Sequence, residues 1–392
     1  SFFVRLDNSS NPNIFLGPQA TVIINNDDNT YVTIDNLSVT ENAGVATITL
    51  KLSDNVSSPV TVGFSILDQS ADNGSGSDYL ALSKSITFDP MTTLVQDNIT
   101  INNDNIIEDN ETFFVRLDNS SNSNVFLGPQ AVVTINNDDN ATITIGDVLV
   151  NESGGFALIT FNLSDNVSSD LSVGYSTLNN TADNASDFEL ISKNILFPAG
   201  TTSFQDNVTI YDDNIVEDNE TFFVRLDNSS NPNVFVGSQA VVTINNDDNA
   251  TVTVSSFSVD EDSGVADIIF SLSDNVSTDF QFTYSTINNT ADNASDFGLI
   301  NRTLTFPAMT SMVSDNISIT PDTIVEDNES FFVRLDHSSK PNVFLGPQAT
   351  VIINNDDNAT VTVDNLSVTE NDGVATITLK LSDNVSSPVT VG

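Results

Sequence analysis

Carboxylates recur at fixed places along this chain, and they are the residues best suited to chemistry. In the middle copy of a repeat, Glu152 follows an apolar run, and Asp187 lies in a short Ala/Asn/Ser segment. The other carboxylates of this copy are Asp212, Asp213, Glu217, Glu220, Asp247 and Asp248. Calcium accepts about six to eight oxygen ligands in flexible geometry, whereas clustered carboxylates without a cation repel one another. The set predicts a calcium site assembled from separate loops, because no EF-hand pattern is present.

A competing interpretation is that these residues only shape turns, since Asp and Asn side chains cap local backbone groups. That interpretation fits any single Asp. The whole set recurs together, however, in a chain with 54 Asp and Glu, 10 Lys and Arg and a net charge of −44. This balance favours a bound cation.

Composition excludes several other classes of function. So few cations leave little to neutralise nucleic-acid phosphates, and the charge opposes binding to anionic membranes. The absence of Cys excludes disulfides, thiolate zinc sites and cysteine nucleophiles, and the single His excludes most His-dependent metal and acid–base chemistry. No catalytic motif is visible, so we expect no enzyme. Pairs of carboxylates can cleave glycosides. The carboxylates of this chain, however, lie in turns of every copy, and the sequence pattern predicts no aromatic-lined cleft beside them.

The chain is built from long repeats. Phe-Phe-Val-Arg-Leu-Asp begins at Phe2, Phe113, Phe222 and Phe331, at spacings of 111, 109 and 109 residues, which is the length of a whole domain. The predicted units are residues 1–28, 29–138, 139–247, 248–356 and 357–392, of which the first and last are partial. Residues 1–63 match 330–392 at 56 of 63 positions, so we interpret the sequence as a window from a longer tandem array.

Short runs with period-2 alternation, such as 141–145 and 157–163, are bounded by Asn, Asp, Gly and Ser. No helical periodicity competes with them. The pattern predicts an all-β protein of tandem antiparallel Ig-like Greek-key β-sandwiches, with about seven strands each. No Gly/Ser or Pro-rich linker separates the units, so we expect a semi-rigid array.

Four blocks occur in order in each full copy, and in the second copy they read Val-x-Glu, Thr-Ala-x-x-x-Ser-Asp-Phe, Asp-Asp-x-x-x-Glu-x-x-Glu-x-Phe-x-Val-x-Leu and Ile-x-x-Asp-Asp. In this the chain resembles the Calx-beta domain, found in sodium–calcium exchangers and in tandem arrays on extracellular adhesion proteins. The resemblance implies a calcium-binding Ig-like sandwich. It also implies that Phe113, Val115 and Leu117 are core. Phe114 and Arg116 then point outward, either to a lateral or interdomain contact or to partial cover within their own domain.

The resemblance extends the candidate calcium ligands to every full copy. In the first they are Glu41, Asp78, Asp104, Glu108, Glu111, Asp138 and Asp139. In the second they are the eight residues named above, and in the third they are Glu261, Asp296, Asp322, Glu326, Glu329, Asp356 and Asp357. Asn103 and Asn105 flank Asp104, and Pro321 and Thr323 flank Asp322, where the family's best sites have unbroken acidic triplets. We therefore predict that the second copy binds calcium most tightly.

The leading functional hypothesis is a structural and adhesive extracellular or cell-surface protein, in which calcium stiffens a rod or filament. Its partners would be calcium, copies of itself and possible N-glycans on some of 26 sequons, although an Asn-rich chain produces sequons by chance. Nucleic acid binding and membrane insertion of this segment are not expected. The alternatives are a calcium-sensing regulatory module and an adhesin that binds glycans or partner cells.

Overall fold

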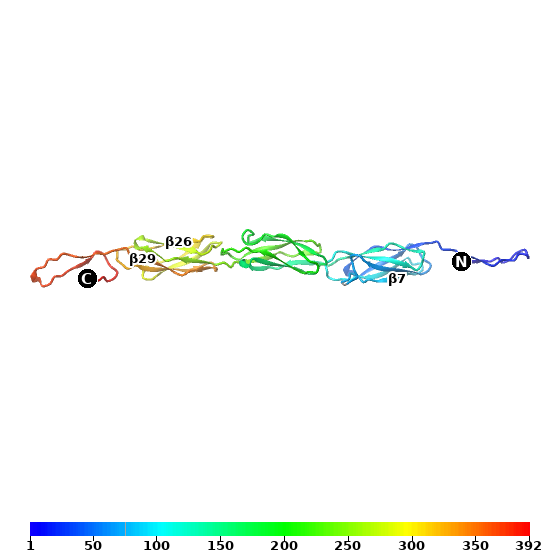
Figure 1. Cartoon of the computed structure of the whole chain (residues 1–392), viewed down its shortest axis with the longest axis horizontal. Coiled ribbons are helices and arrows are strands. Elements are labelled where there is room, and N and C mark those ends of the chain that lie inside the picture. The colour runs from blue at the N-terminus through cyan, green and yellow to red at the C-terminus, as the bar shows by residue number, and fades with distance from the viewer. Residues whose placement is uncertain (75) are drawn as a thin grey trace.

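The computed structural model describes residues 1–74 and 76–392, and nearly all of its regular structure is β-strand. Three sandwiches follow one another end to end, and a shorter stranded segment lies at each end of the row (Figure 1). The described residues contain no α-helix, only four single turns of 3₁₀ helix. The predicted all-β class is confirmed. No helix in this part of the chain is long and apolar enough to cross a bilayer.

The strands fall into three equivalent sets and two terminal pairs. The first sandwich comprises β3 (Thr30–Ile34), β4 (Leu37–Thr40), β5 (Val45–Leu52), β6 (Val60–Asp68), β7 (Ser83–Phe88), β8 (Leu94–Thr100), β9 (Glu111–Ser120), β10 (Val125–Leu127) and β11 (Ala131–Asn136). The second comprises β12 (Ala141–Ile145), β13 (Val148–Asn151), β14 (Phe156–Leu163), β15 (Leu171–Asn179), β16 (Ser192–Phe197), β17 (Ser203–Thr209), β18 (Glu220–Ser229), β19 (Val234–Val236) and β20 (Ala240–Asn245). The third comprises β21 (Ala250–Val254), β22 (Phe257–Asp260), β23 (Val265–Leu272), β24 (Phe280–Asn288), β25 (Asn301–Phe306), β26 (Met312–Ser318), β27 (Glu329–Ser338), β28 (Val343–Leu345) and β29 (Ala349–Asn354). The terminal pairs are β1 (Phe2–Val4) with β2 (Ala20–Val22) and β30 (Val361–Val363) with β31 (Leu379–Leu381).

Each sandwich packs a four-stranded sheet on a five-stranded sheet. In the first the orders are β10-β3-β5-β8 and β4-β11-β9-β6-β7, and the other two sandwiches repeat them. Each sandwich therefore has nine strands, whereas the sequence predicted about seven. The first strand is split between the sheets as β3 and β4, and the three-residue β10 follows β9. The break is stabilised by Asn36, whose Oδ1 accepts a hydrogen bond from the Val132 backbone at 2.8 Å.

Most pairs are antiparallel, as predicted, but two pairs in each sandwich are parallel. β10 pairs with β3, and β11 pairs with β4. These contacts join the first and last strands of a sandwich across about a hundred residues of sequence. Local periodicity carries no information on such a pairing.

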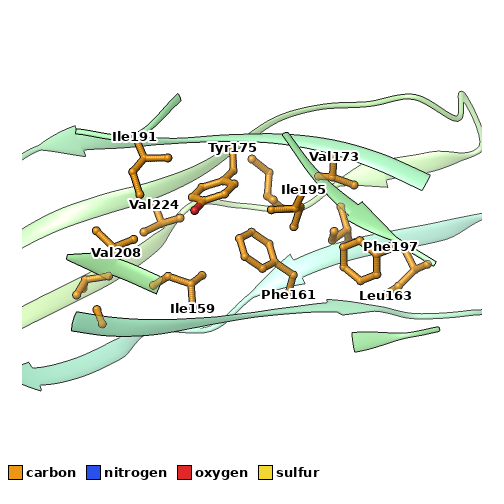
Figure 2. Close-up of a cluster of buried hydrophobic side chains, with 14 of the residues drawn as sticks. Ile159, Phe161, Leu163, Val173, Tyr175, Ile191, Ile195, Phe197, Val208 and Val224 are labelled. Atoms are coloured by element: carbon orange, nitrogen blue, oxygen red, sulfur yellow. The ribbon is translucent and has the colours of Figure 1, made fainter. Parts of the chain in front are cut away.

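The core lies between the two sheets and is made by the inward half of each alternating strand. In the second sandwich, Phe161 and Ile159 of one sheet face Val173, Tyr175 and Phe197 of the other (Figure 2). The prediction for the Phe-Phe-Val-Arg-Leu strand is confirmed, since Phe113, Val115 and Leu117 are buried in the first sandwich. Burying each such side chain contributes about 1.5–3 kcal/mol.

The outward residues of that strand are accommodated within their own sandwich. Phe114 is half-buried, lying between Leu67 and Val132 of the neighbouring strands. The Arg116 guanidinium pairs with Asp118 at 2.9 Å on the same strand. Partial cover within the domain, rather than an interdomain contact, therefore describes these two residues.

Candidate metal centre

Glu41 begins the site in the first sandwich and is positioned by a tight turn. It is the first residue of η1 (Glu41–Ala43), which follows β4, and only 6% of its surface is exposed. The turn ends at Gly44 with φ of 72°, a left-handed conformation that glycine adopts at little cost. The chain then enters β5. The same arrangement recurs at η2 (Glu152–Gly154) and η3 (Glu261–Ser263). The turn η4 (Glu370–Asp372) of the C-terminal segment also ends at a left-handed glycine, but its glutamate is exposed.

Three carboxylates from three loops meet where one sandwich joins the next. We call this set the junction triad; in the first sandwich it is Glu41, Asp104 and Asp139, whose oxygens lie within 4.8 Å of one another. The Asp104 backbone N–H donates to Glu41 Oε1 at 2.8 Å, and Asp104 Oδ1 accepts from the Ile106 N–H at 2.7 Å. The equivalent triads are Glu152, Asp213 and Asp248, and Glu261, Asp322 and Asp357.

A second set, which we call the inner triad, lies beside the first. It is Asp78, Glu108 and Glu111 in the first sandwich and Asp187, Glu217 and Glu220 in the second. In the third sandwich, Asp296, Glu326 and Glu329 line the equivalent pocket. The pocket of the second sandwich has a volume of about 10 Å³, room for one water-sized group, and Glu152 also lines it. The two triads of a sandwich are therefore contiguous.

Four predicted ligands lie outside these triads: Asp138, Asp212, Asp247 and Asp356. Asp138 Oδ1 accepts a hydrogen bond from the Asn42 backbone at 3.3 Å. Their charges still act on the site: burial and then repulsion by Asp138 raise the pKa of Asp139, and burial and then repulsion by Asp247 raise that of Asp248. The sequence pattern missed Asn137, whose Oδ1 accepts from the Glu108 N–H at 3.1 Å and so positions the inner triad.

Burial and mutual repulsion raise the pKa values of the glutamates well above their usual range. Desolvation, followed by repulsion from Asp78 and Asp104, raises the pKa of Glu108 to about 7. Burial, together with a carboxyl–carboxyl hydrogen bond to Asp78, raises the pKa of Glu111 to about 8. Glu220 in the second sandwich reaches about 8 for the same reasons. The direction of these shifts is the one expected when several carboxylates are buried together without a cation.

The protein itself supplies little compensating charge. All ten Lys and Arg side chains form ion pairs, but none of their partners is one of the predicted ligands. The Oδ2 atoms of Asp139, Asp248 and Asp357, one in each junction triad, are buried without a hydrogen-bond partner. Such an orphaned oxygen is costly unless a cation reaches it. An oxygen-only donor set with unpaired buried oxygens fits calcium.

Comparison with known proteins identifies the repeat. The model of the Calx-beta domain matches residues 24–147, 139–249 and 245–358, which cover most of the chain. The chain belongs to the Calx-beta domain family. The resemblance stated from the sequence is thereby confirmed. Calx-beta domains are non-catalytic calcium-binding modules, in agreement with the acidic sites described above.

Solved structures similar to this Calx-beta chain include tandem and single domains. The CBD12 domains of CALX1.2 are 19% identical, with 55% of this chain and 99% of that chain covered and a TM-score of 0.28. The calcium binding domain CBD12 of CALX1.1 is 21% identical, with 54% and 99% covered and a TM-score of 0.28. The apo-form Calx CBD1 domain is 26% identical, with 28% and 100% covered and a TM-score of 0.27. A comparison with curated protein sequences gives no match.

Calcium binding to these Calx-beta domains should release protons. Near neutral pH, Glu108 and Glu111 are partly protonated because their pKa values are about 7 and about 8. Calcium binds the ionised form, so we expect release on the order of one proton per sandwich and an affinity that rises through this pH range. Calorimetry in two buffers with different heats of ionisation measures the release. An identical binding enthalpy in both buffers would contradict it.

One cation does approach an inner triad, from the next Calx-beta domain. Lys340 of the third sandwich pairs with Asp218 of the second at 3.1 Å. Burial and repulsion by Asp187 and Asp213 raise the pKa of the neighbouring Glu217, and the charge of Lys340 partly opposes this rise. The equivalent position in the second sandwich is Asn231, so the junction before that sandwich lacks this contact. Sequence reasoning missed Lys340 because the pairing crosses 122 residues.

Lys340 affects the calcium site of the second sandwich, which the sequence predicts to bind calcium most tightly. That ranking stays a prediction. A nearby positive charge opposes calcium, so we expect Lys340→Asn to raise the calcium affinity of the second sandwich a few-fold. The expected change is roughly 0.5–1 kcal/mol, because Asp218 is exposed and solvent screens the pair. Titration of the full chain measures this, with Lys193→Asn, which breaks a pair on the sheet surface with Asp206, as the control. A lower affinity after Lys340→Asn would mean that Lys340 supports the site instead.

Proposed function

We propose that this chain is a structural segment of an extracellular or cell-surface protein in which calcium ions stiffen a row of Calx-beta domains. One observation carries the proposal. Asp139 belongs to the connection between β11 and β12, yet its carboxylate meets Glu41 and Asp104 of the preceding sandwich. An ion bound there holds the connection to the sandwich, so the angle between neighbours depends on calcium.

The same geometry recurs at Asp248 and Asp357, with the orphaned oxygen in each case. In this proposal the repeat units are those predicted from the sequence. The 22 predicted carboxylates supply the calcium ligands and the negative charge around them. The triads contribute the direct ligands, while Asp138, Asp212, Asp247 and Asp356 add negative charge beside them. The chain acts through shape rather than catalysis, and copies of itself are its expected partners.

Small-angle scattering on the full chain tests this proposal. In calcium we expect a rod with one well-defined length. In chelator at the same ionic strength we expect a broader distribution of lengths, because the carboxylates at each connection repel and the connection loosens. The sandwiches themselves should stay folded, since their cores are apolar. Identical scattering curves in the two conditions would sink the proposal.

The runner-up is a calcium-sensing regulatory module, since a Calx-beta domain that changes shape with calcium would suit that role equally. The recurrence of equivalent triads in three successive sandwiches favours a spacer over a sensor. An adhesin that binds glycans or partner cells is the third possibility. If the protein is secreted, Asn55, Asn166 and Asn275 are exposed sequon positions where N-glycans would be accommodated.

A further inference from the structure

A side chain from each of the first two sandwiches is buried in the core of the next. Ile107 lies in the loop between β8 and β9 of the first sandwich and is 0% exposed. It belongs to the buried cluster of the second sandwich, together with Val167 and Leu171, and not to the cluster of its own sandwich. Val216 of the second sandwich is likewise 0% exposed and belongs to the cluster of the third.

The backbone of the same residue is also held by the next sandwich. The Ile107 N–H donates to the Asn166 carbonyl at 2.9 Å, and the Ile107 carbonyl accepts from the Ser168 N–H at 3.0 Å. These two bonds form a parallel β-bridge between Ile107 and Val167. The bridge between Val216 and Val276 is built in the same way. Each junction therefore satisfies both backbone groups and the apolar side chain of one residue.

The chain contains an internal comparison. Val56 occupies in the first sandwich the position of Val167 and Val276, but no residue of a preceding sandwich bridges to it among the described residues. Val56 is 8% exposed, whereas Val167 is 1% and Val276 is 2% exposed. At the other end, Val325 bridges to Val385 of the C-terminal segment, and both are only half-buried. The residue is fully buried where a complete sandwich follows it.

We propose that Ile107 and Val216 are plugs that complete the core of the following sandwich, so that the second and third sandwiches are each stabilised by the one before. The receiving surface, formed around Val167 or Val276, is then a docking site for the loop of a preceding copy. The coupling is directional. The sandwich that donates the plug loses little when the plug is removed, because the side chain does not contribute to its own core.

Hydrogen exchange measured by mass spectrometry on the full chain tests this. In Ile107→Ala we expect exchange at least about tenfold faster in β14 and β15 of the second sandwich, and within about twofold of wild type in β5 and β6 of the first. Val216→Ala should move the effect to β23 and β24 of the third sandwich. These strands differ in sequence, so their peptides are distinguishable. Chelator is present throughout, which makes the result independent of the proposed calcium function.

Two controls define the outcome. Ile107→Val should behave nearly as wild type, because Val216 fills the equivalent place. Ile106→Ala removes a half-buried neighbour in the same loop and should leave the second sandwich protected. The proposal is overturned if Ile107→Ala leaves β14 and β15 unchanged, or if its main effect falls on the first sandwich. The first result would make the bridge an orientation contact without a contribution to stability, and the second would mean that Ile107 stabilises its own sandwich instead.

Discussion

Adding calcium to the chelator-treated protein is expected to raise its melting temperature by more than about 10 °C, because folded sites bind calcium and the unfolded chain does not. Each site occupied at a hundred times its dissociation constant adds about 2.7 kcal/mol to the free energy of unfolding. Each sandwich has two adjoining triads, so the gains accumulate. Differential scanning calorimetry measures the shift.

The rise in melting temperature is expected to be large because the glutamates of the site are partly protonated when calcium is absent. Burial and repulsion raise the pKa values of Glu108 and Glu111 to about 7 and about 8, from an ordinary value of 4.5. The folded chain therefore holds protons that the unfolded chain has already lost at neutral pH. By linkage, this contribution to stability is complete at pH values below 4.5 and is lost as the pH rises through about 8. Calcium replaces those protons.

Salt alone also screens repulsion among 54 carboxylates, so the control is choline chloride at matched ionic strength. Magnesium is the second control, since it demands near-octahedral geometry and keeps its water ligands. We expect both to shift the melting temperature by less than half as much as calcium. Equal shifts in all three would assign the stabilisation to general screening and would remove the case for a built site.

Glu152→Gln is expected to weaken calcium binding by the second sandwich about 10- to 100-fold, the usual cost of disturbing a metal site. Glu152 is the residue of choice because it belongs to the junction triad and also lines the pocket of the inner triad. Burial and repulsion by Asp213 and Asp248 raise its pKa to about 7. Calorimetric titration should show weaker binding, while the first and third sandwiches keep theirs.

The same variant should be at least as stable as wild type in chelator, since glutamine keeps the shape and removes a repelled charge. This opposite response separates a ligand from a structural residue. Glu189→Gln is the matched control: Glu189 is an exposed glutamate of the same sandwich, accepting a hydrogen bond from Thr209 at 2.7 Å, and lies outside both triads. Unchanged calcium affinity in Glu152→Gln, or equal loss in the control, would refute the assignment.

The sequence was sufficient for the class of fold, because alternation along strands such as 157–163 reports directly which side chains face the core. It was not sufficient for the strand count. The split between β3 and β4 depends on the Asn36 side chain replacing a backbone partner, and β10 is too short to carry a pattern. The parallel pairs depend on contacts between the two ends of a sandwich.

The candidate site was predictable as a set of residues but not as an arrangement. The carboxylates were identified because they recur in every copy. In each sandwich the structure divides most of them into two triads, and Asp138 and its equivalents lie beside the triads. Which oxygens converge depends on loop conformations that only the packed sandwich defines. Ile107 and Lys340 were missed for a related reason, because both act on a neighbouring sandwich and their roles are not visible within one repeat.

The parallel pairing of β4 with β11 has a mechanical consequence. The chain enters the first sandwich through β3 and β4 and leaves it through β11, and four register pairs, from Leu37 with Val133 to Thr40 with Asn136, join the two strands side by side. Tension applied along the row of sandwiches pulls these parallel strands in opposite directions along their length. All four register pairs then bear the shear together, whereas an antiparallel hairpin pulled from its ends would open one pair at a time.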